Sequence, residues 1–176
     1  MTKIESAGVI GAGVIGSGWI ARFLLNGIDV FVYDPSKDAP KNVNKVIQNA
    51  EGAYAQLLTS DLPKRGTLTF ENSISDVSKS ADIIIEAVPE RLSVKQSVYD
   101  EIELSANNNV IIASSTSGIL PSDLQAKMKQ PERLIVAHPF NPVYLLPLVE
   151  IVGGSKTSKE LIERASSIFT NVGMFP

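Results

Sequence analysis

Apolar runs of strand length alternate with helical patterns along most of the chain. Successive residues of each run differ little in polarity and do not alternate between apolar and polar. This indicates burial of both faces of the strand, as in a parallel sheet. The predicted strands cover residues 7–10, 29–33, 81–88, 110–114 and 133–137.

Amphipathic helical patterns fill the spaces between those strands. The first helix places apolar residues on one face and ends at Asn26-Gly27, a typical C-terminal cap; that face comprises Ile15, Trp19, Ile20 and Phe23. A longer helix is predicted from about residue 40 to 58. Three later helices are predicted to begin at capping residues that have Gln or Glu three positions on, namely Ser93, Ser122 and Thr157.

The alternation of strand and helix predicts an α/β fold with a Rossmann-like, doubly wound and mostly parallel sheet. A length of 176 residues suits one well-packed domain, so we expect residues 1–176 to form a single unit. The pattern breaks at residues 139–147, where three prolines predict a stiff, irregular loop.

Charge and composition exclude several classes of protein. Sixteen basic and nineteen acidic residues give a net charge of −3 with no basic cluster, which argues against a nucleic-acid partner. The absence of Cys excludes disulfides and thiolate metal sites, and we predict no metal. No apolar run approaches the ~20 residues that span a bilayer. The N-terminus leads into a strand instead of a signal peptide, which predicts a cytoplasmic protein.

A glycine-rich turn joins the first predicted strand to the first helix. Its sequence is Gly11-Ala12-Gly13-Val14-Ile15-Gly16. In this context Gly11 permits the tight turn, Gly13 lets a pyrophosphate approach the backbone, and Gly16 allows close packing of helix and strand. The helix N-terminus then offers free N–H groups and partial positive charge to phosphates. The motif therefore predicts a dinucleotide site.

Asp34 stands at the end of the second predicted strand, 18 residues past Gly16. A carboxylate at this place accepts the ribose hydroxyls of adenosine and repels the 2′-phosphate of NADP, so the sequence favours NAD. The alternative is that Asp34 simply begins the turn Asp34-Pro35-Ser36.

The chain's single histidine, His138, follows a predicted strand and opens the proline-rich loop. Open α/β sheets bind ligands at the carboxyl ends of their strands, which makes His138 a candidate catalytic base. Glu150 lies in an apolar run twelve residues later. A buried carboxylate needs a partner, and His138 is available. The alternative places Glu150 on the solvent face of an alternating strand.

Four segments resemble, in order, the landmarks of the 3-hydroxyacyl-CoA dehydrogenase family, over essentially the whole chain. They are residues 11–16, 86–92, 114–118 and 138–150. The resemblance implies that His138 and Glu150 are the catalytic pair and that Ser117 and Asn141 face the substrate. It also implies a cofactor site that includes Ala87, Val88, Glu90 and Lys95.

Two segments depart from the acyl-CoA enzymes of the family, which typically carry Asn-Thr-Ser-Ser and His-Phe-Phe-Asn-Pro. This chain has Ser115-Thr116-Ser117-Gly118 and His138-Pro139-Phe140-Asn141-Pro142. Residues 88–92, 116–125 and 141–154 are instead similar to the branch that oxidises L-carnitine. L-Carnitine is therefore the expected small-molecule substrate, with L-gulonate and 3-hydroxyacyl-CoA as alternatives. Phe140 and Tyr144 are candidate walls for its trimethylammonium group.

The resemblance implies hydride transfer from the substrate's C3 to NAD while His138 takes the hydroxyl proton. Imidazole suits this role because it exchanges protons near neutral pH. In the family, a helical C-terminal domain follows, mediates homodimerisation and completes the substrate cleft. An alternative of another class is a nucleotide-binding module without turnover, because that domain is absent from these residues.

Overall fold

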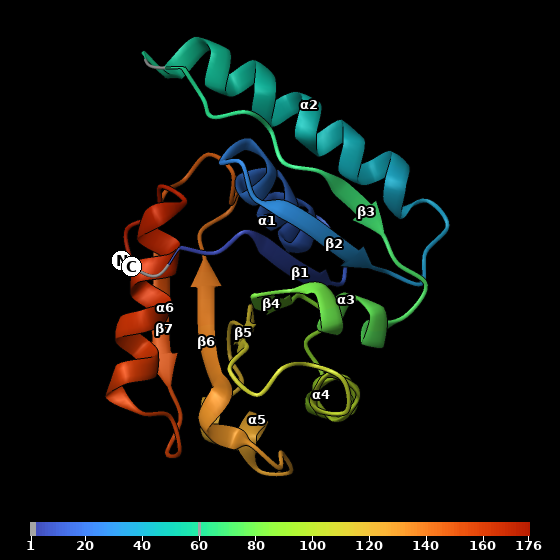
Figure 1. Ribbon diagram of the computed structural model, residues 1–176, viewed down its shortest axis with the longest axis vertical. Helices are drawn as coiled ribbons and strands as arrows, with labels where there is room; N and C mark the ends of the chain where they lie inside the picture. The colour runs from blue at the N-terminus through green and yellow to red at the C-terminus, as the bar shows by residue number, and fades with distance from the viewer. Residues whose placement is uncertain (1–2, 60) are drawn as a thin grey trace.

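A computed structural model describes residues 3–59 and 61–176 (Figure 1). Seven strands form one sheet in the order β3-β2-β1-β4-β5-β6-β7. Their bounds are Ser6–Ile10 for β1, Asp29–Tyr33 for β2, Leu68–Phe70 for β3, Ile83–Glu86 for β4, Ile111–Ser114 for β5, Leu134–Pro139 for β6 and Val149–Gly153 for β7. Strands β1 to β6 run parallel to one another, and β7 runs antiparallel to β6. The predicted doubly wound sheet is confirmed.

Helices cover both faces of this sheet, because its central strands are apolar on both sides. The bounds are Val14–Leu25 for α1, Ala39–Leu57 for α2, Ile74–Ser80 for α3, Leu92–Glu103 for α4, Pro121–Gln125 for α5 and Lys159–Asn171 for α6. One hydrophobic core holds residues of α1, α2 and α6, and the other holds residues of α3, α4 and α5. In β4, Ile83 and Ile85 belong to the first core and Ile84 to the second.

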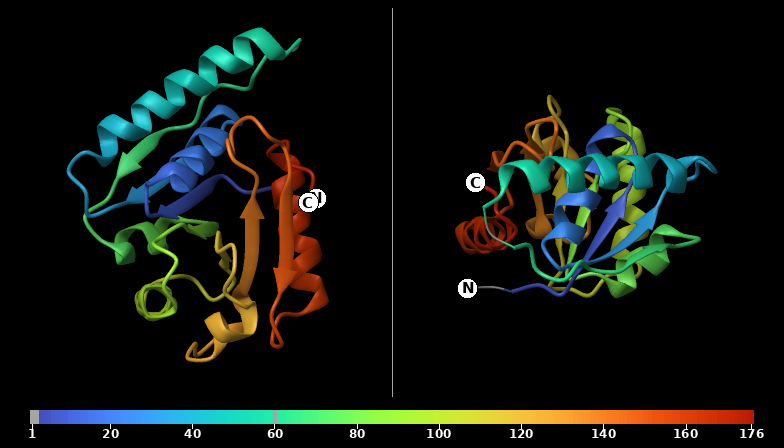
Figure 2. Two further views of the ribbon diagram at one scale, coloured as in Figure 1. Left: turned by 180° about the vertical axis from the view of Figure 1, so that it is seen from behind. Right: turned by 90° about the horizontal axis from the view of Figure 1, so that it is seen from above.

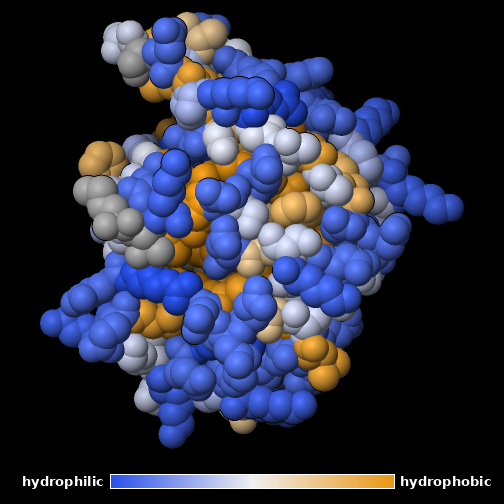
Figure 3. Space-filling model, viewed as in Figure 1, coloured by the Kyte–Doolittle hydropathy of each residue, from blue (hydrophilic) through white to orange (hydrophobic). Residues whose placement is uncertain are grey.

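The first core contains the largest fully buried side chain, Trp19. Trp19 of α1 is fully buried, stacks on Phe23 at 5.7 Å between ring centroids, and meets Phe169 of α6 at 5.2 Å. These contacts join α1 to the C-terminal helix, and α2 packs on the outer side of α1 (Figures 1 and 2). Hydrophilic side chains cover most of the face drawn in Figure 3, where hydrophobic surface appears in a hollow near the middle.

The sheet is strongly twisted, so that β2 and β6 point in clearly different directions in Figure 1. The chain reverses direction across the sheet between β1 and β4, since β2 and β3 lie on one side of β1 and the later strands on the other. Ligands bind outside the carboxyl ends of the strands at such a switch point. The turn after β1 is therefore the expected place for a binding site.

Several local predictions were wrong. The strand β3 and the helix α3 were not predicted; β3 is only three residues long. Ser93, Ser122 and Thr157 are not helix caps, since the capping positions are Arg91, Leu120 and Ser158. Thr157 instead donates its hydroxyl to the Leu134 carbonyl at 2.8 Å, and Ser122 accepts the Ser155 amide at 3.0 Å. Both hydroxyls thus serve tertiary contacts.

Candidate active site

The glycine turn between β1 and α1 has the geometry that its spacing predicts. Gly11 adopts φ +92°, and a Cβ there would lie 2.6 Å from the Ala87 carbonyl oxygen. A Cβ on Gly16 would lie 1.8 Å from the Gly11 carbonyl oxygen, so only glycine allows this approach of helix to strand. A Cβ on Gly13 would meet nothing within 4 Å. The backbone at Gly13 is therefore open to a ligand.

A cleft of about 560 Å³ lies against this turn, within the usual size range of small-molecule sites. Its lining is mostly apolar and comes from the carboxyl ends of β1, β2 and β4 and from α3 and α4: Ile10, Gly11, Gly13, Tyr33, Asp34, Pro35, Ile74, Ala87, Val88, Pro89, Val94 and Val98. Apolar walls suit a flat heteroaromatic ring, and the carboxylate of Asp34 is the charged group of the lining.

Asp34 is fixed by two backbone amides. Its Oδ2 accepts the Ala12 amide at 2.6 Å, and its Oδ1 accepts the Ser36 amide at 2.8 Å. The second bond is the turn-initiating contact of the alternative interpretation, and Asp34 also lines the cleft. The turn contact is therefore present, and the position of Asp34 in the cleft is compatible with the predicted role in ribose binding. The Ala12 bond also ties the end of β2 to the glycine turn.

The candidate cofactor residues divide into two groups. Gly11, Gly13, Asp34, Ala87 and Val88 line the cleft. The remaining six lie around it: Ala12 and Gly16 are buried in the turn, Val14 is exposed, Ile15 packs on the core, and Glu90 and Lys95 lie near the loop after β5.

Lys95 does not face solvent. Its side chain is 1% exposed, and its Nζ lies 2.7 Å from Glu86 Oε1 and 3.4 Å from Glu90 Oε2. Glu90 in turn accepts the hydroxyl of Thr116 and the amides of Ser117 and Gly118. Burial raises the pKa of Glu90, but these hydrogen bonds and the Lys95 charge outweigh it and hold that pKa below its usual value.

His138 and Glu150 form a direct pair at the sheet edge. They are partners in the β6–β7 register, and His138 Nδ1 lies 2.8 Å from Glu150 Oε2. Their side chains are 32% and 60% exposed. The predicted burial of Glu150 was therefore wrong. Glu150 lies on the exposed face of an alternating strand and is nevertheless paired with His138.

Side chains of α1 and α2 anchor the loop after β6 through hydrogen bonds. Arg22 donates to the Val143 carbonyl at 3.1 Å and 3.3 Å, and the Tyr54 hydroxyl donates to the Tyr144 carbonyl. Val143 is fully buried and would clash with a Cβ on Gly18. Burial lowers the pKa of Arg22, against the opposing effect of Tyr54. The irregular loop predicted around residues 139–147 is thus firmly anchored, although Pro139 still belongs to β6.

A small hollow of about 190 Å³ adjoins the His138–Glu150 pair. Its walls include Ser117, Leu120 and Val136 as well as His138 and Glu150. The structure thus brings three of the four candidate catalytic residues to one hollow. Asn141 is exposed on the next loop and is not part of its walls.

Sequence reasoning missed the contributions of α3 and α4 to the cleft, namely Ile74, Val94 and Val98. A signal for α3 was present. Ser73 caps the helix by accepting the Asp76 amide at 3.1 Å, and its hydroxyl donates to the Asp76 carboxylate at 2.6 Å. This is the spacing of a capping box, with Asp in place of Glu.

Two further properties concern the described residues 3–59 and 61–176. No helix among them is long and apolar enough to cross a bilayer. No cluster of three or more His, Cys, Asp or Glu side chains among them is arranged to hold a metal ion.

Comparison with known proteins identifies the family. Residues 6–176 match the family model "3-hydroxyacyl-CoA dehydrogenase, NAD binding domain". An L-carnitine dehydrogenase of Mesorhizobium japonicum is 54% identical over 100% of this chain, and an L-carnitine dehydrogenase/betainyl-CoA thioesterase of Rhizobium meliloti is 54% identical over 99%. The chain spans 49% and 35% of the lengths of these two relatives.

Solved structures agree with this relationship. The structure of 5-formyl-3-hydroxy-2-methylpyridine 4-carboxylic acid 5-dehydrogenase, described as an NAD+ dependent dismutase, superimposes with a TM-score of 0.90 at 33% identity. That match covers 99% of this chain and 57% of the other. The chain belongs to the family of 3-hydroxyacyl-CoA dehydrogenase NAD-binding domains.

Proposed function

We propose that this chain is the cofactor-binding part of an NAD-dependent dehydrogenase that oxidises the 3-hydroxyl of L-carnitine to give 3-dehydrocarnitine. The observation that carries the proposal is the His138–Glu150 pair, at 2.8 Å, on the same sheet as a complete dinucleotide fingerprint. The names of the relatives at 54% identity support L-carnitine as the substrate.

The residues of the cleft fit NAD. Gly13 leaves the backbone open for a pyrophosphate, and the first N–H groups of α1 are free of helical partners there. Asp34 is held in place by two amides, so its remaining lone pairs are available for ribose hydroxyls. Bound in this cleft, NAD supplies the hydride acceptor. Ala87 and Val88 form the cleft wall on the side of β4.

In this mechanism His138 removes the proton of the substrate hydroxyl. The carboxylate of Glu150 can only accept a hydrogen bond, so the imidazole carries its proton on Nδ1 and presents Nε2 as the free base. Glu150 thereby fixes the tautomer and stabilises the imidazolium that forms. Ser117 and Asn141 orient the substrate, and Glu90 holds the backbone beside Ser117.

One aromatic side chain near the pair, that of Phe140, suits a quaternary ammonium group. Phe140 is 40% exposed, and its ring centroid lies 6.1 Å from that of His138. Aromatic faces attract such cations, which supports L-carnitine over an anionic sugar acid such as L-gulonate.

A second candidate is a dinucleotide-binding module that has no turnover by itself. The exposure of Glu150 favours it, since the pair is open to water on its outer side. A helical C-terminal domain, homodimerisation through that domain and a cytoplasmic location belong to the proposal for the whole protein. Within it, residues 1–176 are the NAD-binding domain.

The test is an NAD-reduction assay on the full-length protein with L-carnitine, L-gulonate and 3-hydroxybutyryl-CoA as substrates. The proposal predicts the highest kcat/KM with L-carnitine. Preference for either of the other two would reassign the substrate, and no reduction with any of the three would favour the module without turnover.

A further inference from the structure

Arg22 of α1 is a buried cation that has no carboxylate as a partner. The residue is 6% exposed, and within residues 3–59 and 61–176 it forms no ion pair. Its guanidinium donates from Nε and Nη2 to the Val143 carbonyl and lies 5.9 Å from the ring centroid of Tyr54. Burial of a cation without a counter-charge costs free energy. Arg22 is therefore a poor choice of side chain for stability alone.

Arg22 and Tyr54 together hold two consecutive carbonyls of the loop after β6. Arg22 donates to the Val143 carbonyl, and the hydroxyl of Tyr54 in α2 donates to the Tyr144 carbonyl. Tyr54 is only 7% exposed, so its hydroxyl bond is also shielded from water. Because the guanidinium and the phenol ring contact each other, the two side chains act as one unit, here called the Arg22–Tyr54 clamp.

The turn inside the loop uses a different carbonyl for its own hydrogen bonds. The Pro142 carbonyl accepts the Leu145 and Leu146 amides, each at 2.9 Å. The next two carbonyls, those of Val143 and Tyr144, bond to side chains instead. Val143 is fully buried, and a buried carbonyl needs a partner. The clamp supplies that partner from α1 and α2, so the loop is fixed relative to these two helices.

The clamped loop also carries Asn141, two positions before Val143. The helix α1 begins at the glycine turn beside the cofactor cleft. Gly18 of α1 packs directly on the loop, since a Cβ there would lie 2.8 Å from the Val143 Cβ. The loop with Asn141 is therefore seated on the helix whose first turn faces the cleft.

We propose that Arg22 and Tyr54 are positioning residues that set the place of Asn141 relative to the bound cofactor. This inference rests on the proposed function, in which Asn141 orients the substrate. Both residues act through the loop backbone, because their polar atoms bond to its carbonyls. The His138–Glu150 pair belongs to β6 and β7, so its geometry does not depend on the clamp. The clamp therefore governs how the substrate is held and leaves the ionisation of the base unchanged.

Two conservative variants loosen the clamp. Tyr54→Phe keeps the aromatic ring and removes only the hydroxyl that donates to the Tyr144 carbonyl. Arg22→Lys keeps the positive charge but replaces the planar two-donor fork, which now holds the Val143 carbonyl, by a single ammonium. Each variant thus weakens the hold on one of the two carbonyls.

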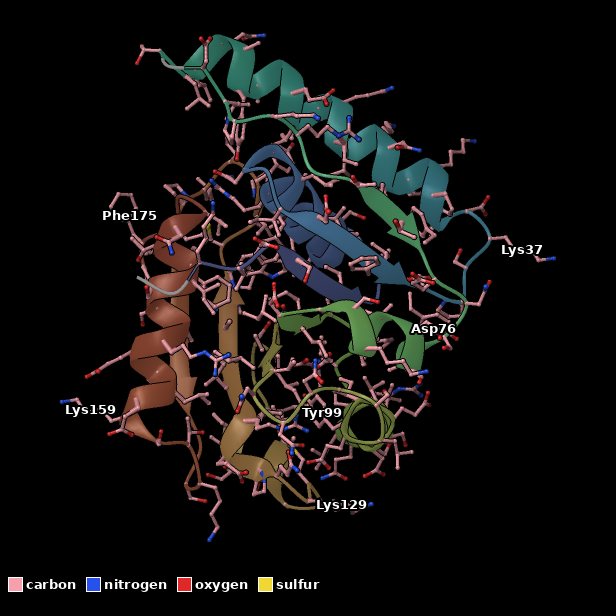
Figure 4. All side chains as sticks on the ribbon, viewed as in Figure 1. Lys37, Asp76, Tyr99, Lys129, Lys159 and Phe175 are labelled. Atoms are coloured by element: carbon pink, nitrogen blue, oxygen red, sulfur yellow. The ribbon has the colours of Figure 1, made fainter. Side chains whose placement is uncertain are left out.

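Arg133→Lys is the matched control for Arg22→Lys. Arg133 is 4% exposed and also donates to a backbone carbonyl, that of Asn107, at 2.8 Å. It directly precedes β6, whereas the clamped loop follows that strand. Figure 4 shows this separation: Lys129, shortly before Arg133 in the sequence, is labelled at the bottom of the view, and Phe175 is labelled far above it. The Phe175 amide bonds to the carbonyl of the last loop residue, at position 147.

The experiment measures kcat, KM for L-carnitine and amide hydrogen exchange at Leu145 and Leu146 in the full-length protein. Tyr54→Phe and Arg22→Lys should each raise KM by about tenfold, with a smaller change in kcat, and lower the protection of both amides by a similar factor, as expected for loss of one hydrogen bond. NAD affinity and the pH dependence of kcat should stay unchanged. Arg133→Lys should leave KM and both amides unchanged, even where it lowers stability.

A double variant tests whether the clamp acts through Asn141. Asn141→Ala should itself raise KM, and addition of Tyr54→Phe should raise it no further, because both changes remove the same contact with the substrate. A further, additive rise would overturn the proposal. Unchanged KM in Tyr54→Phe and Arg22→Lys would also overturn it, even if both variants are less stable. If Arg22→Lys does not fold, Tyr54→Phe decides.

Failure of the proposed function can be told apart from failure of the clamp. If the full-length protein oxidises none of L-carnitine, L-gulonate and 3-hydroxybutyryl-CoA, the proposed function is refuted by that result alone. Amide exchange then decides on the clamp. Unchanged protection of the Leu145 and Leu146 amides in Tyr54→Phe would overturn it, whereas lower protection there, with Arg133→Lys unchanged, would support it.

Discussion

Glu150 faces His138 across the antiparallel register of β6 and β7, with 2.8 Å between the carboxylate oxygen and Nδ1. The sheet itself fixes this relationship, because both residues belong to strands. The geometry of the pair therefore does not depend on the loop between them. That loop is anchored separately by Arg22 and Tyr54. In the proposed mechanism the sheet, and not the loop, therefore orients the base.

Asp34 should determine the choice between NAD(H) and NADP(H). The unmodified chain is expected to bind NAD(H) more tightly than NADP(H). Asp34→Asn should reduce the ratio of the two affinities by roughly 10- to 100-fold. This corresponds to the about 1.5–3 kcal/mol that hydrogen bonds to a charged group contribute. Calorimetric titration with both cofactors measures this. Asp29→Asn, at the opposite end of β2, is the control. Equal affinities in the unmodified chain would refute the role of Asp34.

Substitution by alanine should affect stability at one glycine of the motif and NAD binding at another. Gly16→Ala places a Cβ 1.8 Å from the Gly11 carbonyl oxygen and should destabilise the fold by about 1–3 kcal/mol or more. Gly13→Ala meets nothing within 4 Å, so it should fold normally yet bind NAD more weakly because the methyl group occupies the path of the pyrophosphate.

Urea unfolding and NAD titration together separate these two effects. Gly52→Ala is the control, since it also meets nothing within 4 Å and lies within α2. It should stabilise the chain by about 0.5–1 kcal/mol and leave NAD affinity unchanged. Normal NAD affinity in Gly13→Ala would contradict the placement of the pyrophosphate.

Glu90 should make stability depend on pH in the acid range. Its pKa in the folded chain lies below the ordinary 4.5, so the folded state favours the carboxylate. The resulting stabilisation is fully present above the ordinary pKa and is lost as pH falls through the folded value. The difference in free energy of unfolding between the unmodified chain and Glu90→Gln should therefore be constant from pH 7 to about pH 5 and shrink below it. A difference that grows on acidification would contradict this assignment.

The 176-residue chain should bind NAD but oxidise L-carnitine little or not at all. The residues proposed to hold the cofactor all lie within this chain, mostly in the loops that follow β1, β2 and β4, whereas the His138–Glu150 pair is partly open to water. Turnover needs a sheltered, well-oriented substrate, and a displacement of about 1 Å can cost ~10²-fold in rate. The comparison is NAD affinity and L-carnitine oxidation in this chain and in the full-length protein. Equal turnover in both would contradict the prediction.

The sheet could be predicted from the sequence because its central strands are uniformly apolar and its turn chemistry is specific. The run Ile83–Glu86 is fully buried, and the close approach of strand and helix at Gly11 and Gly16 leaves no room for a Cβ. The three-residue strand β3 carries too short a pattern to be recognised. Helix starts were misplaced where a hydroxyl such as that of Thr157 serves a distant backbone group instead of its own helix.

The candidate site was predictable in part. The pairing of His138 with Glu150 followed from one histidine and one carboxylate in an apolar run, although the assumed burial of Glu150 was wrong. The burial of Lys95 was not predictable, because its partner Glu86 becomes visible only when β4 and α4 are packed together. Local sequence reveals a side chain's chemistry, but its partners depend on the tertiary fold.

The most direct test of the central claim is NAD reduction with L-carnitine by the full-length protein and by its His138→Ala and Glu150→Gln variants. The account predicts that His138→Ala lowers kcat by roughly 10²–10⁴-fold, the usual contribution of a positioned acid/base. NAD affinity should stay almost unchanged in both variants, and Glu150→Gln should slow turnover and shift its pH dependence. Near-normal turnover in His138→Ala would contradict the account, because no other group described at this hollow is proposed to take the hydroxyl proton.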